Sequence, residues 1–324
     1  MNKWWSSLTI FSSVQWLFFI FANTVVVPIS IGSIFELPTE TIAMMLRSSL
    51  ILTGIACILQ GSIGHKYPLM EGHSGLLWGV MLNLGISASA LGMSYEQIGG
   101  GIATGIILAG VVAVLIAVFN LINFVQKVFS PMVTTVYLFL LTFQLIFIFF
   151  QGMLQRTDTG ELNVPVSLLS IGIVILVSML KINGNALLGN FSILIGIVIG
   201  WVVFVLLFPE YIQSPVSTGF AISLFPLGMP NLQIGIVAVA FFAGVINLSN
   251  TIASIRAAAS LYKEEAEEGQ YKRSFFLTGI FAFVSSIFGL VPYTPFTSSI
   301  GFLQSTRIFI KEPFFLVVAL LVLM

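Results

Sequence analysis

A glutamate and a histidine stand inside a strongly apolar stretch of this chain. Residues 67–79 read YPLMEGHSGLLWG and contain Glu71, His73 and three glycines. An ionisable side chain within a membrane-spanning segment is costly, and it is therefore a candidate for binding a proton or a polar ligand. The alternative for Glu71 is a position at the cytoplasmic mouth of the protein, or at the start of the helix that follows it.

A second stretch is interrupted in the same way. Residues 291–304 read VPYTPFTSSIGFLQ, with two prolines and several hydroxyl side chains. Proline lacks an amide donor and disfavours helix in the preceding residue, so we expect each stretch to begin extended and to become helical after its polar residues. Non-helical backbone at membrane depth is tolerated only when it is buried in protein or lines a wet cavity. Its free amides and the following helix N-terminus can then bind a polar or anionic ligand.

Composition indicates which elements hold these residues. The chain is 58% hydrophobic and 7% charged, with a mean hydropathy of +1.08, which is far from a soluble domain. Its single cysteine, Cys57, excludes an internal disulfide and a cysteine metal cluster, and zero formal net charge disfavours nucleic acid as a partner. We expect an all-α polytopic membrane protein with no metal or cofactor. We expect no cleaved signal peptide, because the first apolar run lacks a small-residue cleavage site.

Long apolar runs predict about ten membrane segments. The connections between them are short and hold nearly all the charge, and we expect the longest, residues 256–273, to be a solvated loop or surface helix. The predicted segments are 8–32, 43–63, 68–86, 99–119, 129–151, 163–180, 187–208, 232–255, 274–291 and 295–306, with a further run from Pro313.

Charge asymmetry predicts the orientation of these segments. If the N-terminus is cytoplasmic and each segment crosses once, ten lysines and arginines lie inside and two, Arg47 and Arg156, lie outside. This is the excess that the positive-inside rule expects. The ten inside are Lys3, Lys66, Lys127, Lys181, Arg256, Lys263, Lys272, Arg273, Arg307 and Lys311.

The two interrupted segments occupy equivalent places in two halves. Pro68 comes 60 residues after the first span begins at Leu8, and Pro292 comes 60 residues after the span that begins at Leu232. Seven spans separate the two starts, so the halves would be inverted in the membrane. Interrupted segments at corresponding positions indicate a transporter's binding site at the midplane. Two kinked helices that only pack are the alternative.

At these residues the chain resembles the nucleobase–ascorbate transporter family, which includes the bacterial uracil and xanthine permeases. The resemblance covers nearly the whole chain. Four stretches carry it: QWLFFIFANTVVVP (15–28), YPLMEGHSGLLWG (67–79), KVFSPMVTTVYLFLLTFQLI (127–146) and PYTPFTSSIGFLQSTR (292–307). The last is similar to the Pro-Tyr-Thr-x-Phe pattern of the purine permeases and is the most specific.

The resemblance implies a fold of seven plus seven segments in two inverted repeats, with short strands in segments 3 and 10. Residues 1–208 would form the first repeat, with core segments 1–4 and gate segments 5–7. Residues 209–324 would form part of the second, with segments 8–10 and the start of segment 11. About three spans of the second repeat are then absent, and the chain would be a fragment, a truncated gene product or a naturally short form.

The family's binding residues carry over position by position. The resemblance implies that the ligand lies between segments 3, 8 and 10, and Phe296 is an additional candidate because its ring could stack on a planar base. The expected binding residues are Gln15, His73, Ser74, Gly75, Asn247, Thr251, Phe296, Ser298 and Ser299.

Several of these positions depart from the family pattern. Asn247 stands where the family has a glutamate tied to proton coupling, and an amide cannot titrate. Ser298 stands for Glu or Gln, Ser299 for Asn, and Trp16 for the histidine of the first segment. We therefore expect Glu71, with or without His73, to carry the coupling proton, and His73 to fill the space left by the missing first-segment histidine.

Together these features predict a secondary transporter for a nucleobase. The expected substrate is a purine such as xanthine, or uracil, and the sequence does not separate the two. Protons, the lipid bilayer and a second copy of the chain are the expected partners, and the plasma membrane the expected location. An anion transporter of the same fold and a truncated, non-transporting chain are the alternatives. A membrane enzyme has little support, because the chain lacks metal-ligand spacing and a phosphate-binding loop.

Overall fold

The computed structural model describes most of the chain as helices joined by short connections. The described residues are 7–128, 130–154, 161–184, 188–189, 191–211 and 223–306. The first half contains α1 (Ser7–Ile34), α2 (Thr39–Ser62), β1 (Glu71–His73), α3 (Gly75–Ile86), α4 (Ala88–Leu91), α5 (Tyr95–Val118), α6 (Ile122–Val128), α7 (Pro131–Met153), α8 (Val164–Asn183) and α10 (Ser192–Leu207). After these come η2 (Pro209–Tyr211), α11 (Ile234–Tyr262), α12 (Glu268–Ile287), β2 (Tyr293–Pro295) and α13 (Ser298–Thr306).

Five of the described helices are long and apolar enough to cross a membrane, namely α1 from Ser13 onward, α2, α5, α8 and α11. The shorter helices α3 and α10 are also apolar. These features show a multi-pass membrane protein, as the sequence predicts. The predicted run from Pro313 lies outside the described residues.

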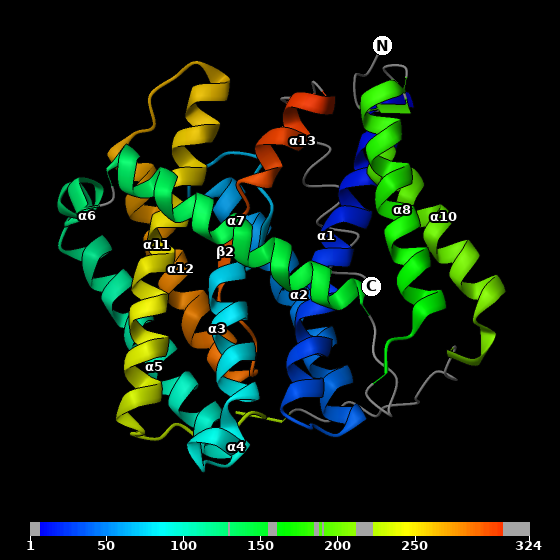
Figure 1. The fold of residues 1–324 in the computed structure, drawn as a ribbon. Coiled ribbons are helices and arrows are strands. Elements are labelled where there is room, and N and C mark those ends of the chain that lie inside the picture. Colours follow the sequence, from blue (N-terminus) through cyan, green and yellow to red (C-terminus); the bar gives the residue numbers. More distant parts are fainter. Residues whose placement is uncertain are drawn as a thin grey trace.

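The helices form two groups joined by the first two helices (Figure 1). Helices α5, α11 and α12 pack closely on one side, and α8 packs against α10 on the other side. Helix α7 contacts α3, α8 and α11 and crosses the front of the molecule in Figure 1. The connection between α11 and α12 lies at the opposite end of the molecule from α4.

Small residues allow the tight packing of α5. A Cβ added to Gly105 would lie 2.6 Å from both the Ala240 Cβ and the Val237 carbonyl oxygen of α11. A Cβ added to Gly110 would lie 3.0 Å from the Gly279 carbonyl oxygen of α12. Close backbone approach at small residues is the usual way in which membrane helices associate.

The charged residues between α11 and α12 extend these helices rather than forming a separate surface element. Helix α11 continues to Tyr262 and ends at Lys263, whose φ of 58° is the left-handed conformation of a helix C-cap. Helix α12 begins with a capping box in which Glu267 and Gln270 bond to each other's backbone amides. The expectation of a solvated loop or surface helix over residues 256–273 is therefore wrong for most of its length.

Both interrupted segments are extended before they become helical. Strands β1 and β2 pair antiparallel, with Glu71 opposite Pro295 and His73 opposite Tyr293. Helix α3 begins just after β1, and the Ser74 hydroxyl caps it by accepting a hydrogen bond from the Leu77 amide at 3.3 Å. The pairing satisfies backbone groups that membrane lipid could not satisfy.

Candidate functional site

One face of the strand pair packs on α2, and His73 is fixed there. The His73 Nδ1 donates to the Val291 carbonyl oxygen at 2.7 Å, and its Nε2 lies 2.6 Å from the Ser49 hydroxyl. The neutral ring therefore carries its proton on Nδ1 and accepts from Ser49. Tyr293 lies beside it, with ring centroids 4.8 Å apart, and donates to the Ser49 carbonyl at 3.0 Å. The imidazole is thus held in one orientation.

The other face of the strand pair packs on α11 through side-chain hydrogen bonds. The Asn250 amide nitrogen donates to the Thr294 hydroxyl at 3.2 Å, and the Thr297 hydroxyl lies 3.3 Å from the Asn250 oxygen. Ser254 donates to the Pro295 carbonyl at 2.9 Å and lies 3.0 Å from the Thr297 hydroxyl. Helix α11 therefore holds both β2 and the start of α13.

A cavity of about 580 Å³ opens beside the strand pair. Its size lies within the range of small-molecule pockets. The apolar part of its lining includes three aromatic rings, Phe19, Trp78 and Phe296. Its polar part has no Lys, Arg, Asp or Glu among the described residues. The polar lining residues are Asn23, His73, Thr142, Asn250, Thr297 and Ser298.

The cavity contains some of the residues expected at the binding site. His73, Gly75, Phe296 and Ser298 line it. The remaining expected residues do not line it, although all are buried. These are Gln15, Ser74, Asn247, Thr251 and Ser299.

Three of the residues that do not line the cavity make hydrogen bonds within the protein. The Ser74 hydroxyl donates to the Asn247 side-chain oxygen at 2.7 Å, so the two link α3 to α11. The Ser299 hydroxyl accepts from the Met70 amide at 3.0 Å. The side chains of Ser74, Asn247 and Ser299 thus bond within the protein and lie outside the cavity lining, and their role in binding stays a prediction.

The other two lie elsewhere in the core. Gln15 is buried in α1 eight residues before Asn23, which is about 12 Å along a helix. Thr251 is fully buried in α11, directly after Asn250. Trp16 belongs to the same buried cluster as Met70, and it does not line the cavity that His73 lines.

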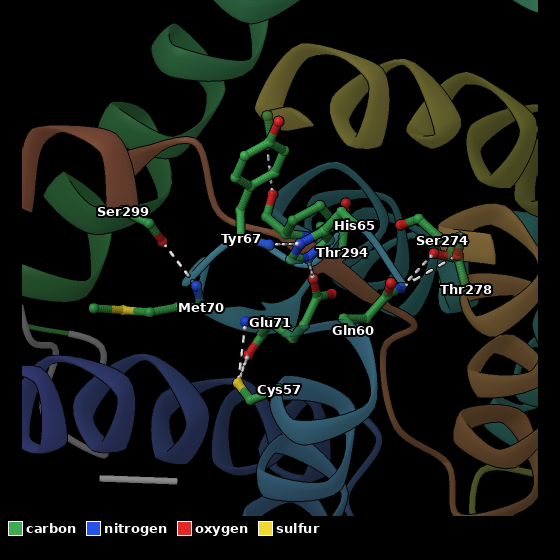
Figure 2. A network of polar contacts seen from close by, with 12 residues as sticks. Cys57, Gln60, His65, Tyr67, Met70, Glu71, Ser274, Thr278, Thr294 and Ser299 are labelled. Carbon is green, nitrogen blue, oxygen red and sulfur yellow. Dashed lines mark hydrogen bonds and ion pairs between the residues drawn. The ribbon is translucent and has the colours of Figure 1, made fainter. Parts of the chain in front are cut away.

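Glu71 is paired with His65 and not with His73 (Figure 2). The Glu71 Oε1 lies 3.0 Å from the His65 Nε2, and both side chains are at most 1% exposed. The His65 Nδ1 accepts from the Tyr67 amide at 3.0 Å, so its proton lies on Nε2 and is donated to Glu71. His73 is not a partner of Glu71 in this structure, because both of its ring nitrogens bond to other groups.

The His65 loop is tied to α12 and to the end of α11. Gln270 donates to the His65 carbonyl at 2.7 Å, and Arg273 donates to the Ile63 carbonyl at 2.7 Å. The Tyr67 hydroxyl donates to Glu264 at 2.8 Å, and burial together with this bond raises the pKa of Tyr67 to about 12. Tyr67 therefore remains a donor at physiological pH.

Sequence reasoning missed Asn23, Thr142, Asn250 and Thr297 as cavity residues. Asn250 comes three residues after Asn247 and thus one helical turn away. Polar residues repeated at helical spacing were the available signal, whereas the family resemblance pointed to Asn247.

Comparison with known proteins gives the same class of protein. A model described as the Permease family matches residues 7–324. The chain is 27% identical over 317 residues to the putative purine permease YwdJ of Bacillus subtilis (strain 168). The matched region covers 95% of this chain and 71% of that protein. It is 24% identical to the uric acid permease PucJ of the same organism, over 91% of this chain and 66% of that protein.

A solved structure shares the fold. The transmembrane domain of a cyanobacterium bicarbonate transporter, BicA, superposes with a TM-score of 0.60 over 98% of this chain and 81% of that domain. The sequences are 14% identical, so the likeness concerns the fold alone.

Proposed function

Since the chain belongs to the permease family, the nucleobase–ascorbate transporters, we propose that it binds a nucleobase and carries it across the plasma membrane by secondary transport. A purine such as xanthine, or uracil, is the proposed substrate. The cavity between α1, β1, α3, α11 and the start of α13 carries this proposal, because its described lining combines aromatic rings with uncharged hydrogen-bonding groups. A planar, uncharged, polar heterocycle matches that lining.

The same lining separates the proposal from transport of an anion. A site for an inorganic anion gains most of its affinity from Lys, Arg or several aligned backbone amides. Among the described cavity residues there is no cation, and the His73 Nδ1 proton is already donated to Val291. A nucleobase needs no counter-charge.

Our proposal for the architecture is two inverted repeats, residues 1–208 and 209–324, with the N-terminus in the cytoplasm. Antiparallel pairing of β1 with β2 supports it, because inversion would make equivalent strands run in opposite directions. The excess of lysine and arginine on one side supports the orientation.

Proton coupling through Glu71 is part of the proposal. Glu71 lies on β1 two residues before His73, so a change at its carboxyl group acts on the strand that lines the cavity. Glu71→Gln should leave nucleobase binding intact but abolish uptake driven by a pH gradient in proteoliposomes. Unchanged pH-driven uptake would exclude this role.

Equilibrium binding to the purified chain in detergent tests the main proposal. Radiolabelled uracil, xanthine, hypoxanthine and urate would each be titrated at pH 5.5 and at pH 7.5. Saturable binding of one base is expected. Protection against heat by sulfate or chloride, together with no binding of any base, would instead favour the anion transporter.

A further inference from the structure

Two asparagines face the cavity from different helices. Asn23 lies on α1 and Asn250 on α11, and both line the cavity beside the strand pair. Neither was among the residues that the family resemblance implied. We propose that these two amides, and not Asn247, recognise the ligand's edge and thereby set its specificity. This inference rests on the proposed nucleobase transport.

Asn250 has hydrogen-bonding capacity to spare. A carboxamide has two N–H donors and an oxygen with two acceptor sites. One donor goes to Thr294 at 3.2 Å. The Thr297 hydroxyl has a single proton, and two acceptors lie within its reach. Its oxygen lies 3.0 Å from the Ser254 hydroxyl and 3.3 Å from the Asn250 side-chain oxygen, so Ser254 is the nearer of the two. One donor and at least one acceptor site of Asn250 therefore remain for a ligand, while Thr294 and Thr297 fix the plane of the amide.

Asn23 offers the complementary group. Its amide nitrogen donates to the Phe19 carbonyl of its own helix at 2.8 Å, and its oxygen makes no further hydrogen bond among the described residues. The side chain is half-buried and its oxygen is available to accept from a ligand N–H.

This arrangement defines the ligand's chemistry. A ring with adjacent N–H and C=O groups, as in a lactam or cyclic ureide, pairs with a carboxamide through one donated and one accepted hydrogen bond. Such a ligand needs no charge, in agreement with the described lining of the cavity. Uracil, xanthine, hypoxanthine and urate have this edge, whereas adenine lacks the carbonyl.

Competition binding with methylated ligands tests the inference. The probes are radiolabelled xanthine and its four mono-N-methyl derivatives, added to the purified chain in detergent. In the unsubstituted chain, methylation at the recognised nitrogen should weaken binding by about tenfold or more, which corresponds to loss of one hydrogen bond. In Asn250→Ala or Asn23→Ala, xanthine should bind about tenfold more weakly and the penalty for that methyl group should disappear.

Two control variants separate recognition from structure. Asn83→Ala removes the same type of bond as Asn23→Ala, an amide donated to the carbonyl four residues earlier at 2.8 Å, but Asn83 does not line the cavity. Asn247→Ala removes an equally buried amide one turn from Asn250. Both controls should keep the penalty for methylation.

Each result decides between the two proposals. Binding of xanthine with unchanged methyl discrimination in both Asn23→Ala and Asn250→Ala overturns the inference and leaves nucleobase binding established. Loss of discrimination in Asn247→Ala alone also overturns it. Absence of binding of any base by the folded, unsubstituted chain overturns the proposed function together with the inference. If Asn250→Ala fails to fold because Thr294 loses its partner, Asn23→Ala still decides, since its bond lies within its own helix.

Discussion

Gly72 leaves space for an aromatic ring at the edge of the proposed site. A Cβ on Gly72 would lie 2.3 Å from the Cζ of Phe296, which lines the cavity. In Gly72→Ala the ring has to move, and the cavity is the open space beside it. We expect nucleobase affinity to fall at least tenfold, with a loss of stability of about 1–3 kcal/mol from overpacking. Equilibrium binding and thermal unfolding in detergent measure the two effects.

A second substitution shows whether the ring is responsible. Gly72→Ala combined with Phe296→Ala should unfold at a higher temperature than Gly72→Ala alone, because the clash is removed. Gly172→Ala, where an added Cβ meets no atom within 4 Å, is the control and should resemble the unsubstituted chain. If Gly72→Ala binds and unfolds as that control does, the contact with Phe296 is not a constraint.

The buried pair of His65 and Glu71 gives a second prediction at the residue scale. Removing one partner of a buried, hydrogen-bonded ionisable pair typically costs about 3–5 kcal/mol, because the other is left unpaired. His65→Ala should therefore lower the unfolding temperature strongly. In the His65→Ala background, Glu71→Gln should lower the stability less than it does in the unsubstituted chain. The difference, the coupling energy of the pair, should be about 0.5–3 kcal/mol.

Thermal unfolding of the two single variants and the double variant completes this cycle. Glu40→Gln, which changes an exposed carboxylate in the first turn of α2, is the control and should have almost no effect. Strictly additive changes would show that the two side chains do not stabilise each other.

Residue types were easier to predict than residue directions. The glutamate and the histidine of residues 67–79 stood out from the sequence because both are rare in apolar segments. Their partners did not stand out. Ser49 is distant in the chain from His73, and His65 reaches Glu71 through the loop between α2 and β1. Asn247 and Asn250 differ by one turn, and only packing against Ser74 and Thr294 decides which of them faces the cavity.

Packing of α5 against α11 and α12 supports the site at the scale of elements. Gly105→Ala would place a Cβ 2.6 Å from the Val237 carbonyl oxygen and 2.9 Å from the Phe241 amide nitrogen. Backbone atoms in a helix move less easily than a side-chain tip, so α11 would have to shift. We expect destabilisation of about 1–3 kcal/mol and weaker ligand binding, since α11 carries Asn250.

Gly235 of α11 gives a control for the substitution in α5, because it has no close neighbour. An added Cβ at Gly235, in the first turn of α11, meets no atom within 4 Å. Gly235→Ala should unfold at the same temperature as the unsubstituted chain or slightly above it, because alanine favours helix. Equal unfolding temperatures for Gly105→Ala and Gly235→Ala would contradict close packing of α5 on α11.

Helical elements were largely predictable because long apolar runs have few alternatives in a membrane. Prolines marked the two interrupted segments, since they remove amide donors at fixed places. The C-terminus of α11 and the N-terminus of α12 were not predictable from charge. Both helices extend beyond the apolar part of the sequence, and they end at the caps Lys263 and Glu267.

At the scale of the whole molecule, the proposed orientation rests on the distribution of charge, and labelling of single cysteines in intact cells tests it. Cys57 is buried, and its replacement by alanine gives a background without cysteine. Glu40→Cys lies in the exposed first turn of α2, on the proposed outer side. Glu265→Cys lies in the exposed connection between α11 and α12, on the proposed inner side. A membrane-impermeant maleimide should label the first variant in intact cells and the second only after permeabilisation. The reverse pattern would invert the proposed topology, and it would place the loop that carries His65 on the outer side of the membrane.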